Sequence, residues 1–118
     1  MSNSLILHIV PRTDWQTAQK EGIYRTASLQ AEGFIHCSTP EQVLDTANRY
    51  YAKRSDLLLL WIDPQALTAE LRWEEAHGER YPHLYGALNL EAVSQVSPFP
   101  PEPDGVFRTL PTFSNNNG

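Results

Sequence analysis

The sequence predicts an α+β fold, in which a mostly antiparallel sheet carries helices against one side. Short apolar runs typical of strands outnumber helical patterns in the chain of 118 residues. The two clear helical patterns both precede the middle of the chain, and nine prolines divide it into short elements. A chain of this length forms one domain.

The chain opens with a buried strand and a short helix. Leu5–Val10 is a short aliphatic run closed by a proline, which is typical of a buried strand. Thr13 or Asp14 can then cap a helix that Gly22 ends. This helix would bury two residues that share one of its faces, Trp15 and Ala18.

A second strand leads into the clearest helix signal. The pattern of Ile23–Leu29 fits a short strand followed by a turn, and Phe34–Cys37 predicts another buried strand. Thr39 as N-cap, with Gln42 three residues later, forms a capping box. We therefore expect a helix over Pro40–Ala52 with one apolar face.

The second half of the chain contains strand patterns only. Leu57–Asp63 is a continuous apolar run, long enough for a central strand buried on both faces. Leu71–Glu74 alternates in polarity and predicts a strand, and Glu75–Arg80 is expected to be a polar loop. Leu84–Leu88 and Ala92–Val96 are two further strand candidates.

The end of the chain changes in composition. Four prolines between residues 98 and 103 favour extended, unpaired backbone. We therefore place the α+β domain at residues 1–100, followed by a proline-rich extended tail at 101–118 whose last residues, 114–118, are expected to be disordered.

Charge and composition exclude several classes of protein. A formal charge of −5 with scattered lysines and arginines argues against a surface for duplex nucleic acid, although a few arginines could still gather around a phosphate. A single cysteine excludes an internal disulfide. The chain contains neither a signal peptide nor a membrane span, so we expect a cytoplasmic protein that does not bind membranes and is a monomer or weak dimer.

Three of the four histidines lie in or beside segments that favour burial, which predicts a polar site lined by strands. They are His8, His36 and His83. Imidazole donates, accepts or ligates near neutral pH and adds little to apolar packing. A core histidine satisfied by its own neighbours is an equally good interpretation of His8 alone. Three imidazoles also suit zinc, although no spacing motif supports a metal site and we assign none.

The segment after the second strand could bind an anion. His36, Ser38 and the first helical turn after Thr39 would present donors and free backbone N–H groups. Alternatively, Ser38 and Thr39 only cap the helix. Cys37 follows His36 directly, but neighbouring strand residues point to opposite faces, so we do not expect a cysteine–histidine nucleophile.

Further candidates cluster around His83. Tyr85 could stack on a planar ligand, and Gly86 would allow close approach of the backbone. Glu74, beside Trp73, is the best carboxylate candidate. The alternative is a packed turn with surface tyrosines and a solvent-facing glutamate. Together with Ser38, Trp73, Tyr85 and Gly86 are the predicted ligand-binding residues, and His8, His36, Glu74 and His83 the catalytic ones.

Four segments in this order resemble the small bacterial family called domain of unknown function 952. They are Leu7–Ile9, Gly33–Ser38, Trp73–Glu74 and Pro82–Gly86. Members of that family look like compact relatives of the ADP-ribosyltransferase fold, which includes ADP-ribosylating toxins and tRNA 2′-phosphotransferases. The resemblance covers about the first hundred residues. It implies split, mixed or antiparallel sheets with two or three helices, forming a cleft for NAD or an ADP-ribose-like nucleotide.

The resemblance also implies roles for individual residues. His8 is similar to the histidine that holds the NAD ribose, and Gly33–Ser38 looks like the segment that packs on nicotinamide. Glu74 matches the transferase glutamate, or His83 replaces it, which would favour phosphate chemistry or plain binding. Two functions follow: an enzyme that cleaves or transfers the nucleotide, or a non-catalytic module that binds a small phosphate-containing ligand in the same cleft. A metal-dependent hydrolase using the three histidines is a third interpretation.

Overall fold

The structure is a computed structural model that describes residues 4–114. Its strands in chain order are β1 (Ile6–Pro11), β2 (Ile23–Tyr24), β3 (Ile35–His36), β4 (Leu57–Ile62), β5 (Glu70–Ala76), β6 (Glu79–Tyr85), β7 (Leu88–Asn89) and β8 (Val93–Pro98). The helices are α1 (Arg12–Glu21), α2 (Ala27–Glu32), α3 (Val43–Tyr50) and the 3-10 turns η1 (Pro64–Ala66) and η2 (Leu90–Ala92). The paired strands of these elements all run antiparallel, so the predicted α+β class is confirmed.

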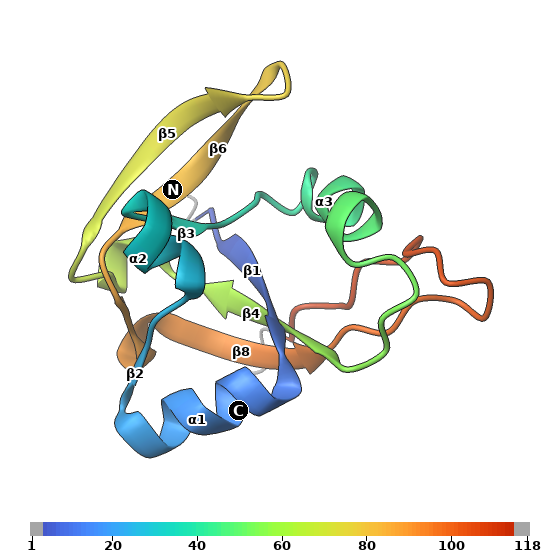
Figure 1. The fold of residues 1–118 in the computed structure, drawn as a ribbon, viewed down its shortest axis with the longest axis horizontal. Helices are drawn as coiled ribbons and strands as arrows, with labels where there is room; N and C mark the ends of the chain where they lie inside the picture. Colours follow the sequence, from blue (N-terminus) through green and yellow to red (C-terminus); the bar gives the residue numbers. More distant parts are fainter. Residues whose placement is uncertain (1–3, 115–118) are drawn as a thin grey trace.

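Two small sheets carry the fold (Figure 1). One has the strand order β1-β4-β8 and the other β3-β6-β5, with β2 and β7 paired separately. A backbone bridge links the sheets, where Leu7 of β1 exchanges two hydrogen bonds of 2.7 and 2.8 Å with Ser38, just after β3. This bridge holds the histidine of β1 close to the histidine of β3.

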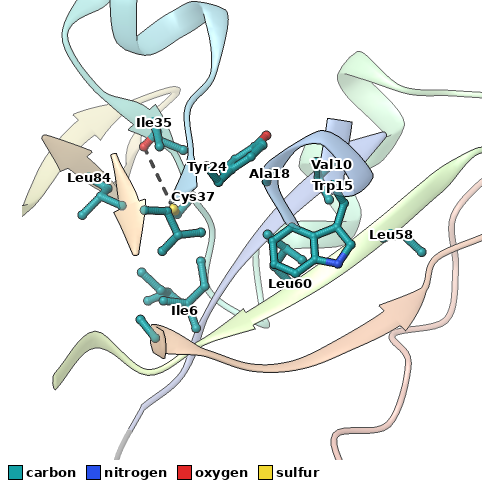
Figure 2. Packing of buried hydrophobic residues seen from close by; sticks show 13 residues of the cluster. Ile6, Val10, Trp15, Ala18, Tyr24, Ile35, Cys37, Leu58, Leu60 and Leu84 are labelled. Carbon is teal, nitrogen blue, oxygen red and sulfur yellow. Dashed lines mark hydrogen bonds between the residues drawn. The ribbon is translucent and has the colours of Figure 1, made fainter. Parts of the chain in front are cut away.

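Strand β4 forms the centre of the core, as its apolar sequence predicts. All six of its side chains are buried. Because side chains alternate across a sheet, Leu58, Leu60 and Ile62 belong to one apolar cluster and Leu57, Leu59 and Trp61 to the other. Figure 2 shows the first cluster, where α1 places the predicted inner-face pair, Trp15 and Ala18, over the sheet.

The helix boundaries differ from the prediction because backbone partners replace side-chain caps. Helix α1 begins at Arg12, whose N–H donates to the carbonyl of Asp56 at 2.8 Å, so neither Thr13 nor Asp14 caps it. It ends at Gly22, as expected, with φ of 80°.

Helix α2 replaces the expected turn after β2. The hydroxyl of Thr26 caps it by accepting from the Leu29 N–H at 3.1 Å. Helix α3 begins three residues later than the expected Pro40. Gln42 uses its side-chain oxygen to accept from the Thr39 N–H, and its amide nitrogen donates to the carbonyl of Arg80 on β6 at 2.8 Å. The segment from Thr39 to Gln42 is therefore a turn tied to the second sheet.

The β5–β6 hairpin overturns the expected polar loop over Glu75–Arg80. Its turn is only His77-Gly78, both with positive φ (53° and 80°), which matches the two-residue turns that suit twisted hairpins. The segment around His83 is therefore strand, not a loop leading into one. The strand expected over Leu84–Leu88 is interrupted at Gly86.

The proline-rich segment begins with Pro98, the last residue of β8, and over residues 99–114 it packs on the core without forming helix or strand. Phe99 and Phe107 are buried in the second apolar cluster. Asn48 of α3 donates to the Phe107 carbonyl at 2.8 Å and accepts from its N–H at 2.7 Å. Phe107 thus joins the core although it lies beyond residue 100, while the predicted disorder at 115–118 falls outside the described residues. None of the helices within residues 4–114 has the length and apolarity needed to cross a membrane.

Candidate functional site

A cleft of about 900 Å³ lies where the two sheets meet. We call it the histidine cleft, because its wall includes three of the predicted residues far apart in sequence, His8, His36 and His83. They come from β1, β3 and β6, and the bridge at Leu7 and the pairing of His36 with His83 bring those strands together. Predicted Ser38 also lines this cleft.

His8 is held rigidly in a neutral form. Its Nδ1 donates to the carbonyl oxygen of His36 at 2.6 Å, so its Nε2 accepts from the hydroxyl of Tyr24 at 2.8 Å. Burial lowers the pKa of His8 to about 4, because desolvation disfavours the charged ring. The ring is therefore a neutral acceptor for the Tyr24 hydroxyl at neutral pH, which fixes that hydroxyl at the cleft wall.

His36 has the opposite environment. Its side chain is exposed, and its Nε2 lies 2.7 Å from the carboxylate of Glu32 at the end of α2. Its ring is steeply inclined to those of Phe34 and His83, at 63° and 76°, with centroids 4.8 and 5.3 Å away. His36 is therefore a solvent-accessible group at the cleft, with a carboxylate partner that lines the same cleft.

His83 is buried on one face and bonded on one edge. Phe34 stacks on its ring with centroids 4.2 Å apart and planes 16° from parallel. Its Nδ1 lies 2.8 Å from Oε1 of Glu74, and the hydroxyl of Tyr85 donates to the same oxygen at 2.7 Å. These two hydrogen bonds lower the pKa of Glu74, so it is an anion at neutral pH.

Neither the cysteine nor the expected anion pocket forms a reactive site next to the cleft histidines. Cys37 points into the apolar core, where Figure 2 shows its thiol directed at the carbonyl of Ile35, and burial raises its pKa to about 12. It does not meet His36, as the strand alternation predicts. The Thr39 N–H already donates to the side chain of Gln42, and α3 begins only at Val43. The expected anion pocket, which combined Ser38 with free N–H groups of a helix starting at Pro40, is therefore not formed.

Several predicted residues lie outside the histidine cleft. Trp73 is 42% exposed on the edge strand β5. Tyr85 and Glu74 stand behind His83, so they reach the cleft only through it. Gly86 serves packing: a Cβ there would stand 2.6 Å from the Cβ of Ala69.

The cleft also contains cations and aromatic rings that the sequence did not single out. Arg25, Arg49 and Arg54 converge on it from the loop after β2, from α3 and from the loop after α3. The sequence indicated these arginines only in general terms, because scattered arginines can gather around a phosphate. Tyr24 had no signal of its own, because its partner His8 is 16 residues away.

The metal interpretation finds no support in these contacts. Within residues 4–114, no group of three or more histidine, cysteine or acidic side chains is placed to hold an ion. Both ring nitrogens of His8 are already engaged within the protein. A zinc site would have to break one of those hydrogen bonds.

Comparison with known proteins shows the family of the chain. Residues 9–96 match the model of a protein family of unknown function, DUF952, so the chain belongs to this family. A crystal structure of protein CC0527 from Caulobacter crescentus is 34% identical, with a TM-score of 0.82 over 89% of this chain and 94% of that one. A solution NMR structure of CC0527 is also 34% identical, with a TM-score of 0.77 over 88% and 91% of the two chains. No curated protein matches this sequence.

Proposed function

We propose that this protein binds NAD or an ADP-ribose-like nucleotide in the histidine cleft and cleaves or transfers it at the nicotinamide–ribose bond. One observation carries the proposal: four imidazoles, His77 as well as the three predicted ones, and three guanidinium groups from separate segments line the same cleft. Such a wall offers cations for a diphosphate, aromatic rings for a planar base, and neutral donors and acceptors for ribose hydroxyls.

Three arginines and two carboxylates, Asp14 and Glu32, line the cleft, so its positive charges outnumber its negative ones. Arg54 is paired with Asp56 at 2.6 Å, whereas Arg25 and Arg49 make no ion pair with the described residues. Both are exposed side chains at the cleft rim. The protein as a whole carries a charge of −5, so this local gathering of arginines supports a phosphate-containing ligand rather than general attraction to polyanions.

The ribose role of His8 acts together with Tyr24. Because His8 Nε2 accepts from the Tyr24 hydroxyl, the oxygen of that hydroxyl keeps lone pairs for a ribose O–H. In this proposal the buried pair orients the ribose, His36 and Ser38 contact the phosphate or the nicotinamide amide, and His83 closes the pocket.

The proposed enzyme is tested by incubating the protein with NAD and measuring free nicotinamide by chromatography. We expect release that is lost in Tyr24→Phe, which removes one oxygen and keeps the ring, and in His8→Ala. Arg49→Ala is expected to weaken binding of ADP-ribose in calorimetry. Arg108→Ala, which removes the same charge from the tail outside the cleft, is the matched control.

A binding module that keeps the cleft without the chemistry is the second candidate. The position of Glu74 favours it, because the carboxylate expected at the reacting carbon stands behind His83. Tight binding of ADP-ribose or NAD without nicotinamide release would select this module. If NAD, ADP-ribose and inorganic phosphate all fail to bind and no nicotinamide is released, both functions are wrong.

A further inference from the structure

The hairpin β5–β6 places a carboxylate behind the imidazole of His83. Glu74 is opposite Tyr81 in the strand register, and His83 is two residues further along β6. Because residues two apart share a face of a strand, Glu74, His83 and Tyr85 project from the same side of the hairpin. Diagonal neighbours across two antiparallel strands are close enough for long side chains to bond.

The hydrogen bonds of Glu74 determine which nitrogen of His83 carries the proton. An ionised carboxylate only accepts hydrogen bonds, so the contact of 2.8 Å requires a proton on Nδ1. In the neutral ring, Nε2 then carries the lone pair. Tyr85 donates to the same Oε1 at 2.7 Å, and the guanidinium of Arg72 lies 4.2 Å from the Tyr85 ring, so two further side chains hold Glu74 in place.

The remaining edge of His83 opens into the histidine cleft. Phe34 covers one face of the ring, and only 7% of the residue is exposed. Among the described residues, every fully buried side-chain nitrogen and oxygen has a hydrogen-bond partner, and Nε2 of His83 has none there. Nε2 is therefore not fully buried, and because His83 lines the cleft we infer that this nitrogen faces it.

We propose that Glu74 and His83 form a carboxylate–imidazole dyad in which Glu74 is a positioning residue and Nε2 of His83 accepts a proton inside the cleft. The reaction step rests on the proposed function. The oxygen of a hydroxyl acceptor, such as water or an alcohol, bonds to the ribose C1′ while the C1′–nicotinamide bond breaks. The bonding electron pair leaves with neutral nicotinamide, and the hydroxyl proton passes to Nε2.

This dyad assigns Glu74 a role different from direct stabilisation of charge at the ribose. A carboxylate that orients an imidazole and fixes its tautomer acts through that imidazole and does not contact the substrate itself. The proposal also names the acceptor class, because a base at Nε2 serves an acceptor with an O–H to lose.

The tautomer can be read directly by NMR of the ring nitrogens in ¹⁵N-labelled full-length protein. We expect Nδ1 of His83 to be protonated and Nε2 unprotonated in the neutral ring, with His83→Gln used to assign the signals. Glu74→Ala should transfer His83 toward the Nε2–H form. Glu75→Ala is the matched control, because it removes the adjacent exposed carboxylate of β5 and should leave the His83 signals unchanged. A wild-type His83 that carries its proton on Nε2 overturns the dyad, even if Glu74→Ala does not fold.

Nicotinamide release supplies the second readout. Glu74→Ala should lower kcat about tenfold or more while KM stays within about twofold, because Glu74 does not touch the ligand. Release that is unaffected by Glu74→Ala refutes the proton-transfer role. A wild-type protein with the expected tautomer but no release refutes the transfer step and the proposed enzyme, and leaves Glu74 assigned only as the residue that orients His83.

Discussion

The two three-stranded sheets treat the same side chain in opposite ways. In the sheet β1-β4-β8, His8 is buried and both of its ring nitrogens are bonded within the protein. In the sheet β3-β6-β5, His83 bonds one nitrogen to Glu74 and leaves the other accessible at the cleft. The first sheet holds its histidine with both ring nitrogens bonded, whereas the second leaves one ring nitrogen of its histidine without a protein partner, and the cleft at their junction is lined by both.

The two sheets also differ in how far their side chains are buried. Strand β4 is the middle strand of the first sheet and has apolar clusters on both faces. Strand β5 is an edge strand of the second sheet, and most of its side chains are exposed or half-buried. We therefore expect stability to depend on the first sheet far more than on the exposed face of the second.

The largest predicted effect is a core truncation in the first sheet. Leu59 is fully buried in the middle of β4, so Leu59→Ala should lower the free energy of unfolding by about 2–5 kcal/mol. Trp73→Ala on β5 removes a larger side chain that is 42% exposed, and we expect a smaller loss, about 1 kcal/mol. Urea denaturation of both variants measures the contrast. Equal losses in the free energy of unfolding would show that the two sheets contribute equally to stability.

The next effect is the pH dependence contributed by His8. Its pKa is lowered from 6.5 in the unfolded chain to about 4 in the fold. At pH 7 the His8 ring is mostly neutral in both the folded and the unfolded protein. Below pH 6.5 the ring binds a proton in the unfolded chain, whereas in the folded protein it stays neutral down to about pH 4. The free energy of unfolding should therefore fall by about 3 kcal/mol from this group across that window.

Comparison with His8→Gln isolates this contribution. Urea midpoints of the two proteins, taken at intervals from pH 7 to pH 4.5, should converge as the pH falls, because only the wild type loses the His8 contribution. Parallel midpoints across that range would mean that His8 titrates alike in the folded and unfolded states.

The contrast between the sheets also explains how far the sequence could predict the fold. The apolar run Leu57–Asp63 could only be a central strand, because no exposed position suits it. The β5–β6 hairpin has polar residues on an open face, so its strand pattern is weak, and its turn, His77-Gly78, contains only one of the usual turn residues. Helix α3 was placed too early because the partner of Gln42, the carbonyl of Arg80, comes from a distant strand.

The sequence could indicate which residues lie at the cleft where a residue type is costly to bury, but not where tertiary contact decides; the roles of these residues stay predictions. His8, His36 and His83 stand out in apolar segments and do share one cleft. Trp73 and Tyr85 were chosen as aromatic neighbours of those segments, but strand alternation and the edge position of β5 place them outside the cleft. The cleft arginines have no local pattern, since they come from the loop after β2, from α3 and from the loop after α3.

A smaller effect tests how the second sheet is anchored. Gly86, directly after β6, has a φ of 154°, a backbone conformation that residues other than glycine rarely adopt. A Cβ added there would stand 2.6 Å from the Cβ of Ala69, just before β5. Gly86→Ala should therefore lower the free energy of unfolding by about 2 kcal/mol, through strain in the backbone and overpacking against a residue that cannot rotate away.

The double variant separates those two causes. Ala69→Gly removes the atom in the way, so adding it to Gly86→Ala should restore part of the lost stability, leaving the cost of the backbone conformation and of the new glycine. Urea denaturation of the two single variants and the double variant gives the coupling energy. If the two losses simply add, the contact between residues 69 and 86 does not constrain the hairpin, and the orientation of His83 would then depend on Phe34 and Glu74 alone.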